Sequence, residues 1–270
     1  MSENPALDSD FIKSNLGISR IGREIIVYKS TASTNDIAGE YASGGKKNDG
    51  LVVFAEHQTA GRGRRGNMWF SQAGKNILCS ILLYEPNIKP DMLTFACGVA
   101  VAESIGRCGE NDAKIKWPND VLLNEKKVAG VLVEGFTKNK KKYFVAGIGI
   151  NCHQKKEDFP RELRQTATSI DIESRIICDR NRLAKRLLVN LDHYLTCGLE
   201  NPGEIVEKWG EKSILLGKRV TVEHNGKEFT GNCIGIEPAE GLILQLERGG
   251  VRMFEAASTT VSSEKLNRWN

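Results

Sequence analysis

The sequence contains no apolar run long enough to cross a bilayer, and its first residues lack the basic start and apolar core of a signal peptide. A membrane-spanning or exported protein is therefore not indicated. The seven cysteines are scattered, odd in number and without any C-x-x-C pair. They predict reduced, buried thiols in a cytoplasmic protein, and they support neither a structural zinc site nor a disulfide framework.

The chain also has little net charge. Its 270 residues include 38 lysines and arginines against 34 acidic residues, which leaves a net charge of +4. Such a balance tolerates acidic partners but does not by itself indicate nucleic-acid binding. No internal repeat or low-complexity linker is evident, and the length allows one large domain with a smaller one.

Helical and strand patterns alternate up to residue 215. Their hairpin-length connections predict an α+β domain over residues 1–215, with a mixed, largely antiparallel sheet and flanking helices. Apolar spacing and capping residues predict helices at 6–16, from 33–35 to 44–45, from Pro90 to about 105, at 180–198 and at about 202–214. Strands are predicted at 25–28, 50–56, 76–83, 114–117, 121–123, 127–136 and 142–151.

The pattern changes after Gly217 to short alternating strands at 218–223, 228–231, 241–246 and 251–254. Asn225-Gly226 is a strong hairpin turn between the first two. Four or five such strands within about 50 residues predict a small all-β barrel, and we assign residues 216–270 to it.

The segment Gly61-Arg62-Gly63-Arg64-Arg65-Gly66 follows an apolar run at 51–55. Its glycines permit close backbone approach, and its arginines carry planar donors that suit phosphate and carboxylate oxygens. The segment matches the dinucleotide-binding pattern G-x-G-x-x-G, but residues 67–71 lack the helical period which that fingerprint requires. We interpret it as an anion-binding loop between strands that holds a nucleotide together with an acid. A solvated basic turn is the alternative.

Two further segments carry polar chemistry. Residues 116–120, Lys-Trp-Pro-Asn-Asp, end a strand because Pro118 interrupts the ladder, and they place a lysine, an asparagine and an aspartate at its edge. A type I turn with proline at its second position explains them equally well. Lys127 leads into an apolar strand that could hold its ammonium against a pocket, although most lysines before strands are solvated gatekeepers.

Five segments taken in order resemble the biotin protein ligases: residues 33–35, 58–66, 116–120, 127–130 and 147–151. The resemblance extends from about residue 25 to the C-terminus, where the short strands are similar to that family's SH3-like domain. It implies an ATP-dependent ligase that joins biotin to AMP with release of pyrophosphate. The biotinyl group would then pass to one lysine of a biotin carboxyl carrier domain in a biotin-dependent carboxylase. Biotin and ATP are the implied substrates and Mg²⁺ the implied cofactor, with no metal ligand certain.

The resemblance also implies catalytic roles. The loop residues 62–65 (Arg62, Gly63, Arg64 and Arg65) would close over biotin and its adenylate, and Arg65 would help to retain that reactive intermediate. Lys127 would reach the biotin carboxylate and the phosphate. Lys116 would add positive charge nearby, and Asp120 would orient the attacking groups or a Mg²⁺-bound nucleotide.

Further residues are assigned to biotin or the nucleotide by the same resemblance. Ser33, Thr34 and Asn35 would bind the ureido ring of biotin, although plain helix capping explains the same residue types. We expect Trp69 to be a core residue rather than a platform for adenine. Residues 154–169 contain no tryptophan, so no adenine-stacking residue is named. The assigned binding residues are Ser33, Thr34, Asn35, Gln58, Thr59, Gly130 and Asn151.

The longest relatives carry an N-terminal winged helix-turn-helix. Residues 1–24 are too few for such a domain, so we expect the monofunctional type of ligase, without specific DNA binding and without a membrane partner. The oligomeric state, a homodimer included, stays open. A lipoate-type acyl ligase of the same fold and a non-catalytic biotin sensor are the alternatives. None of the arginine- and glycine-rich pattern expected of lipoate ligases is seen, which argues against the first. The phosphate-neutralising charge of Lys127 and of the triple-arginine loop argues against the second.

Overall fold

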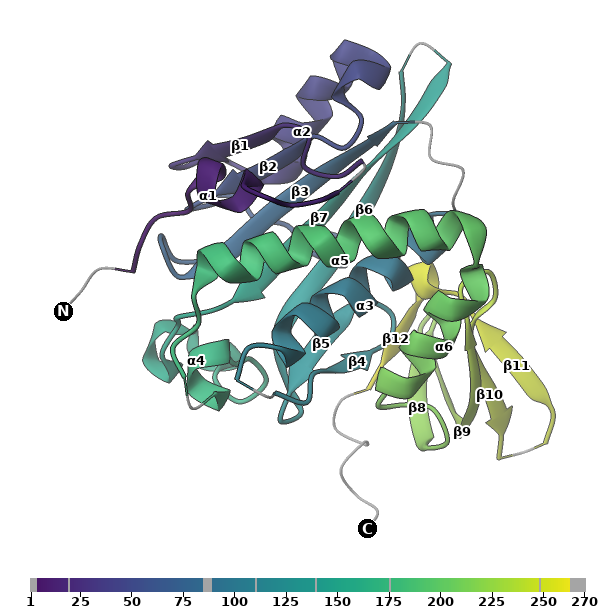
Figure 1. Ribbon diagram of the computed structural model, residues 1–270. Coiled ribbons are helices and arrows are strands. Elements are labelled where there is room, and N and C mark those ends of the chain that lie inside the picture. Colours follow the sequence, from purple (N-terminus) through teal and green to yellow (C-terminus); the bar gives the residue numbers. More distant parts are fainter. Residues whose placement is uncertain are drawn as a thin grey trace.

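Two β-sheets organise the chain. The computed structural model describes residues 4–18, 20–84, 89–109, 111–138, 140–174, 176–247 and 249–262. The larger sheet has seven strands in the order β1-β2-β3-β7-β6-β5-β4, and the C-terminal strands form a five-stranded sheet beside it (Figure 1). The strands of the larger sheet are β1 (Ile25–Tyr28), β2 (Val52–Ala55), β3 (Asn76–Tyr84), β4 (Lys114–Lys116), β5 (Asp120–Leu123), β6 (Lys126–Lys138) and β7 (Lys141–Asn151).

Neighbouring strands of the larger sheet are antiparallel except β1 and β2, which are parallel. Short connections explain the antiparallel pairing of β4 with β5, β5 with β6 and β6 with β7, because antiparallel strands can be joined by tight turns. Strands β6 and β7 form one hairpin, and β4 turns into β5 through residues 117–119. The expected α+β architecture with a mixed, largely antiparallel sheet is confirmed.

Helices cover both faces of the larger sheet. Val52 and Phe54 of β2 join the main core with α3 and α5, whereas Val53 between them joins a second cluster with α2 on the opposite face. The helices are α1 (Ser9–Lys13), α2 (Thr34–Tyr41), α3 (Pro90–Gly106), α4 (Ile170–Glu173), α5 (Arg180–Glu200) and α6 (Pro202–Lys212), with the 3₁₀ segments η1 (Ala42–Asn48), η2 (Arg64–Gly66), η3 (Lys156–Asp158), η4 (Arg161–Leu163) and η5 (Ala256–Ser258). Within the described residues, none of the helices is both long and apolar enough to span a membrane.

Two α-helices are shorter than their sequence patterns predict. Helix α1 begins after Asp8, whose carboxylate accepts two N–H groups of the first turn, and it ends before Asn15, which has a φ of 49°. Helix α2 ends at Tyr41, and the chain continues as η1, within which Gly45 has a φ of 66°. A left-handed residue thus follows the end of α1, whereas α2 passes into 3₁₀ geometry at Ala42, still right-handed, before Gly45 takes its positive φ.

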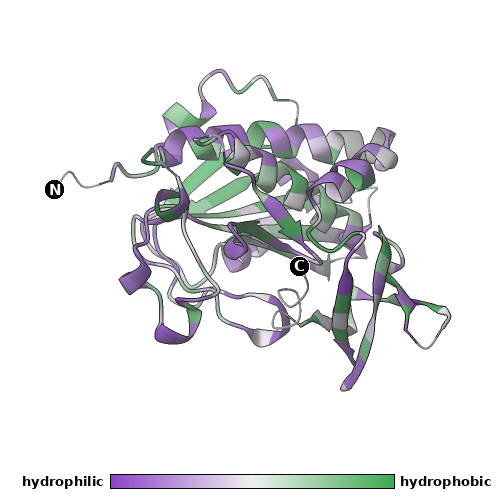
Figure 2. Cartoon of the chain, turned by 90° about the horizontal axis from the view of Figure 1, so that it is seen from below, coloured by the Kyte–Doolittle hydropathy of each residue, from purple (hydrophilic) through white to green (hydrophobic). Residues whose placement is uncertain are grey.

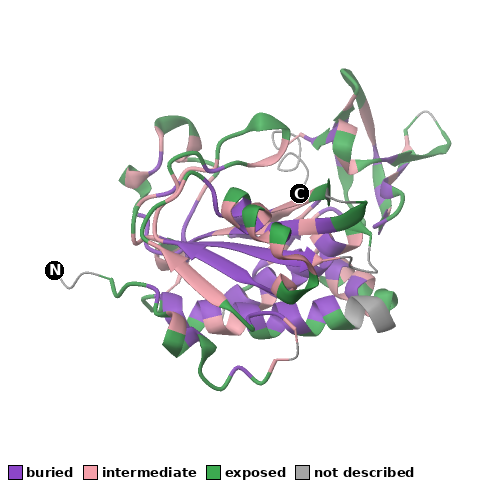
Figure 3. Ribbon diagram, turned by 90° about the horizontal axis from the view of Figure 1, so that it is seen from above, coloured by how far each residue is buried: buried purple, intermediate pink, exposed green. Residues whose placement is uncertain are grey.

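Helix α3 is buried along most of its length because it lies between the sheet and helices α5 and α6. Its Phe95 stacks on Trp209 of α6 with 4.1 Å between ring centroids, and Gly98 leaves room for the same indole. Hydrophobic residues are concentrated in the central strands and the helices packed on them (Figure 2), and the same strands are buried (Figure 3).

The five C-terminal strands form an antiparallel sheet in the order β11-β10-β9-β8-β12. Asn225-Gly226 makes the expected hairpin turn, with φ values of 51° and 74°. The sheet is not a closed barrel within the described residues, because its edge strands β11 and β12 do not pair with each other. The predicted barrel is therefore not confirmed. The strands are β8 (Arg219–His224), β9 (Lys227–Glu237), β10 (Gly241–Leu246), β11 (Val251–Phe254) and β12 (Thr259–Val261).

Candidate active site

The arginine–glycine loop between β2 and β3 folds back on itself. Gly63 N–H donates to the carbonyl oxygen of Asn67 at 2.7 Å, and Trp69 N–H donates to Gly61 at 2.9 Å. No helix follows Gly66 before β3, which confirms that the match to the dinucleotide fingerprint is accidental. The segment is a small hairpin that lies on the α2 face of the sheet.

Glycines make room for this loop on the sheet. Gly130 of β6 pairs with Gly149 of β7, and Gly147 lies two residues further along the same face. A Cβ atom at Gly130 would lie 3.1 Å from Cζ3 of Trp69, and one at Gly149 would collide with the indole ring. The indole therefore occupies space that exists because these strands lack side chains there.

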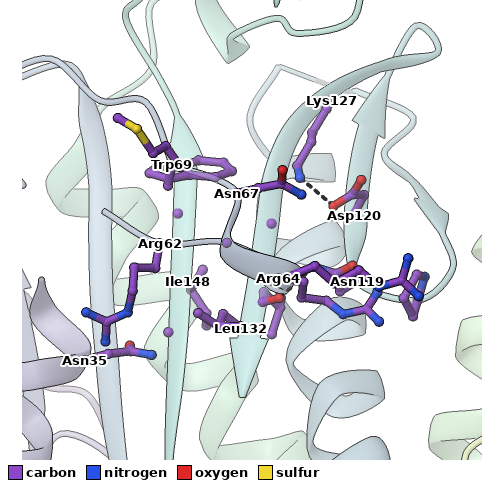
Figure 4. Close-up of a pocket in the computed structure, with 18 of the residues that line it drawn as sticks. Asn35, Arg62, Arg64, Asn67, Trp69, Asn119, Asp120, Lys127, Leu132 and Ile148 are labelled. Carbon is purple, nitrogen blue, oxygen red and sulfur yellow. Dashed lines mark hydrogen bonds and ion pairs between the residues drawn. The ribbon is translucent and has the colours of Figure 1, made fainter. Parts of the chain in front are cut away.

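A cavity of about 300 Å³ lies between the loop, the N-terminus of α2 and this stretch of sheet (Figure 4). We call it the loop cavity. Its size suits a small ligand, and it combines apolar side chains of the sheet with convergent polar groups. The predicted site residues that line it are Ser33, Thr34, Asn35, Gln58, Arg62, Gly63, Arg64, Arg65, Lys116, Asp120, Lys127 and Gly130.

The α2 end of the loop cavity is a buried hydrogen-bond network. Gln58 Oε1 accepts bonds from the backbone N–H of Thr34 at 2.7 Å and from its hydroxyl at 2.9 Å. Ser80 Oγ of β3 lies 2.6 Å from both Thr34 Oγ1 and Asn35 Oδ1. Ser33 caps α2 through its hydroxyl, which accepts the N–H of Asn35. Capping and cavity lining thus coexist in these residues.

At the same end of the cavity, Arg62 forms ion pairs with two carboxylates. It donates to both oxygens of Asp36, at 2.9 and 2.6 Å, and lies 3.4 Å from Glu134 Oε2. The Arg62 hydrogen bonds lower the pKa of Asp36 below its ordinary value. Glu134 Oε2 also accepts a hydrogen bond from the side-chain amide of Asn35 at 2.6 Å, so this one carboxylate connects the loop to α2. In Figure 4 the side chain of Arg62 extends toward Asn35.

The other two arginines contact other parts of the chain. Arg64 donates to Asn119 Oδ1 at 3.3 Å and to the carbonyl oxygen of Ala256, and burial lowers the pKa of its guanidinium. Arg65, with a φ of 56°, donates to the carbonyl oxygen of Ala257 at 3.1 and 3.3 Å. Both arginines therefore connect the loop to η5, the segment that precedes β12.

Lys127 and Asp120 form an ion pair of 2.6 Å on the side of the cavity away from α2 (Figure 4). Lys127 Nζ also lies 5.5 Å from the centre of the Trp69 ring. The backbone of Lys127 is held by residues 166–168, which exchange two hydrogen bonds with it at 2.8 and 2.9 Å. Lys116 lines the same region, and its burial lowers the pKa of its ammonium.

A second cavity, of about 500 Å³, begins where the first ends, and we call it the edge cavity. Lys116, Asp120, Lys127, Met68 and Trp69 line both cavities. Trp69 is half-buried at this junction, so the expectation that it is a core residue is wrong. The other residues of the edge cavity are Phe70, Leu122, Glu125, Asn151, Phe159, Leu163, Gln165, Thr166, Ala167, Ile214 and Lys218.

Two predicted binding residues lie elsewhere. Asn151 lines the edge cavity, where its amide donates to the carbonyl oxygen of Thr168 at 2.9 Å and its Oδ1 accepts from Asn76 at 3.0 Å. Thr59 is exposed, outside the lining of both cavities, and bonded through its N–H to Thr31 at 2.9 Å.

Several residues of the site were not expected from the sequence. Ser80 and Glu134 are polar positions in otherwise apolar strands, which was the available signal. Asp36 looked like an ordinary acidic residue in a first helical turn. In the part of the chain that the structure describes, no group of three or more His, Cys, Asp or Glu side chains is arranged to hold a metal ion.

Comparisons with known proteins agree with this geometry. Residues 27–151 match the model of the biotin/lipoate A/B protein ligase family. The chain is 31% identical over 258 residues to the bifunctional ligase/repressor BirA of Bacillus subtilis (strain 168), a match that covers 93% of this chain and 78% of that protein. It is also 31% identical over 265 residues to the biotin–[acetyl-CoA-carboxylase] ligase of Mycobacterium tuberculosis, covering 95% of this chain and 96% of that one.

The fold of the chain is also similar to that of solved structures. A biotin protein ligase from Aquifex aeolicus in complex with biotin and ATP superposes with a TM-score of 0.77 at 28% sequence identity, covering 89% of this chain and 99% of that one. A mutant form of the Aquifex aeolicus ligase, in complex with biotin, gives a TM-score of 0.76 at 28% identity, covering 89% of this chain and 98% of that one. The chain therefore belongs to the biotin protein ligases of the biotin/lipoate A/B protein ligase family.

Proposed function

We propose that this protein is an ATP-dependent biotin–protein ligase. It activates biotin as biotinyl-5′-AMP and transfers the biotinyl group to a lysine of a biotin carboxyl carrier domain in a carboxylase. The observation that carries the proposal is the Lys127–Asp120 pair at the junction of two cavities. Adenylation requires the biotin carboxylate and the α-phosphate of ATP to approach each other beside a positive charge. A lysine at the junction of a biotin cavity and an ATP cavity supplies that charge.

Biotin occupies the loop cavity in this proposal. Its polar ureido ring lies at the α2 end, where Thr34, Asn35 and Ser80 offer hydroxyl and amide groups. Its apolar tail lies along Leu78 and Leu132 of the sheet toward the junction. A few placed polar groups at the end of an apolar slot are typical of small-molecule sites.

ATP occupies the edge cavity, with adenine among apolar residues that include Trp69, Phe159 and Leu163. The biotin carboxylate attacks the α-phosphorus at the junction. The bond to the bridging oxygen breaks, and pyrophosphate leaves with the electron pair. Lys127 and Lys116 offset the charge that gathers as the two anions approach. In the second step the carrier amine attacks the acyl carbon and AMP leaves.

Mg²⁺ fits the chemistry of this donor set. Asp120 and Glu125 line the edge cavity, and Mg²⁺ is usually held by one or two carboxylates together with substrate phosphates. When bound there, it would supply charge neutralisation for the phosphates. Asp120 additionally orients Lys127 through their ion pair, which positions the ammonium at the junction.

The loop arginines retain the intermediate by keeping the loop closed. Arg65 lines the loop cavity, and its guanidinium binds the carbonyl oxygen of Ala257, which holds the loop against η5. Arg64 acts nearer the ligand through Asn119. We further propose a boundary near residue 216 between the catalytic domain and an SH3-like C-terminal domain, and we place the activity in the cytoplasm, where the six described free thiols stay reduced.

One assay tests the proposal and its alternatives. Purified protein is mixed with ATP, a labelled carrier domain and either biotin or lipoate, and both pyrophosphate release and carrier labelling are measured. We expect biotin-dependent pyrophosphate release and one biotin per carrier. Labelling with lipoate in place of biotin would support the acyl-ligase alternative. Biotin binding without pyrophosphate release would support a sensor.

A further inference from the structure

The segment that follows α6 is attached to the edge of the larger sheet. Ser213 forms a parallel bridge with Ile115 of β4, and Ile214 N–H donates to the carbonyl oxygen of Ile115 at 3.0 Å. Lys218 N–H then bonds to Leu215 at 2.9 Å. The position of Lys218 relative to β4 is thereby fixed by backbone hydrogen bonds.

The same residue is held from the C-terminal sheet. The carbonyl oxygen of Lys218 accepts the N–H of Cys233 in β9 at 2.8 Å. Lys218 is an exposed residue that lines the edge cavity, but it does not line the loop cavity. Lys116 and Lys127, by contrast, line both. Three lysines from three segments of the chain thus line the edge cavity, and Lys218 is the one that lies away from the junction.

The walls of the edge cavity differ in chemistry. Phe159, Leu163 and Ala167 come from the segment that pairs with Lys127, and they make an apolar wall. Lys218 comes from the segment that pairs with β4, the strand that carries Lys116. Within the described residues, the ammonium of Lys218 forms no ion pair, whereas the ammonium of Lys127 is paired with Asp120.

We propose that Lys218 binds the β- and γ-phosphates of ATP and the pyrophosphate that leaves. This inference rests on the proposed function, which places the α-phosphate at the junction. The remaining phosphates must then extend away from the loop cavity, into the cavity that Lys218 lines. An ammonium there offsets the charge that the bridging oxygen gains as its bond to the α-phosphorus breaks. Lys218 has no such role in transfer, because pyrophosphate has already left.

The test separates the two half-reactions in Lys218→Ala, Lys218→Arg and Lys227→Ala. Lys227 is the matched control, since it lies at the opposite end of the β8–β9 hairpin, roughly 20 Å away along the strand. Adenylate formation is followed by pyrophosphate release, and transfer by the labelling of carrier from chemically prepared biotinyl-AMP. Inhibition by inorganic pyrophosphate and by AMP is measured separately.

We expect Lys218→Ala to lower kcat/KM for ATP by on the order of tenfold, the loss of one charge-assisted contact. It should weaken inhibition by pyrophosphate to a similar degree, with AMP inhibition and transfer kept within about twofold of wild type. Lys218→Arg should restore most of the loss, and Lys227→Ala should match wild type. Equal losses in both half-reactions, or unchanged pyrophosphate inhibition, would overturn the proposal. Absence of any biotin-dependent pyrophosphate release in the wild type would instead reject the proposed function itself.

Discussion

At the scale of single residues, the site depends on positions that have no side chain. Gly149 faces the indole of Trp69 so closely that an added Cβ would collide with it. We expect Gly149→Ala to destabilise the protein by about 1–3 kcal/mol through overpacking and to displace Trp69 from the junction. Denaturant unfolding and pyrophosphate release measure the two effects.

Gly39 of α2 is the matched control for that substitution. A Cβ there would meet nothing within 4 Å. Gly39→Ala should therefore be neutral or stabilise the helix by up to about 1 kcal/mol, with activity unchanged. Equal effects of the two substitutions would show that the space above Gly149 does not matter to the site.

Lys127 should matter more for the chemistry than for biotin binding. The ammonium stabilises the negative charge that develops on the phosphate in the transition state more than it stabilises bound biotin. Lys127→Ala should therefore raise the barrier to adenylate formation by about 3 kcal/mol, by analogy with a lost oxyanion-hole donor. Biotin affinity should change far less. Stopped-flow pyrophosphate release and equilibrium biotin binding give the comparison. Release at the wild-type rate would remove Lys127 from the mechanism.

Arg65 should matter for retention of the intermediate. Arg65→Gly removes the contact with Ala257, so the loop should open more often and release biotinyl-AMP, which acylates unrelated lysines. We expect biotin on a bystander protein incubated with the variant, biotin and ATP, as detected by blotting. Arg23→Gly, at an exposed arginine outside both cavities, serves as the control and should give no such labelling. Unchanged bystander labelling by Arg65→Gly would contradict the role of the loop.

At the scale of elements, α2 and the arginine–glycine loop are joined by the Asp36–Arg62 ion pair. The Arg62 hydrogen bonds depress the pKa of Asp36 in the folded state. A depressed carboxyl pKa stabilises the fold above the unfolded-state value, near 4, and this contribution is lost as the pH falls below it. The joint between helix and loop should therefore weaken in acid.

Asp36→Asn tests this pH dependence. At pH 7 the variant should be less stable than the wild type, and the difference should shrink as the pH falls below about 4, because the unfolded chain then takes up a proton that the folded Asp36 takes up only at lower pH. Urea unfolding of both proteins across this range measures it. A stability difference that is constant down to pH 3 would show that the ion pair does not stabilise the folded state.

At the scale of the whole molecule, the described residues ahead of β1 form a single five-residue α-helix, α1. A helix-turn-helix needs two packed helices with a recognition face, so we predict no sequence-specific DNA binding by these 270 residues, with or without biotin. Weak, salt-sensitive association would be compatible with this, because any basic patch produces it. Salt-resistant, biotin-dependent retention of one DNA sequence in a gel-shift assay would contradict it.

The sequence alone predicts most helices and strands from the spacing of apolar residues, and several site residues from the order of the motifs. The strands of the larger sheet and the helices packed on it follow apolar periodicity, which is set by neighbouring residues and is therefore visible in the sequence. The loop at 61–66, the turn at 117–119 and Lys127 were identifiable because their residue types carry chemistry wherever they lie. The open C-terminal sheet was not, since strand patterns do not say whether the edge strands will pair.

Only the tertiary structure decided which groups meet. Register across β3, β7 and β6 places Ser80 and Glu134 beside α2, and it stacks Gly149 and Gly130 under Trp69, contacts between residues far apart in sequence. Arg64 and Arg65 each donate to a carbonyl oxygen of η5 that lies 192 residues away in the sequence, and no local pattern encodes that contact. Periodicity specifies which face a side chain occupies, whereas long-range packing determines what it finds there.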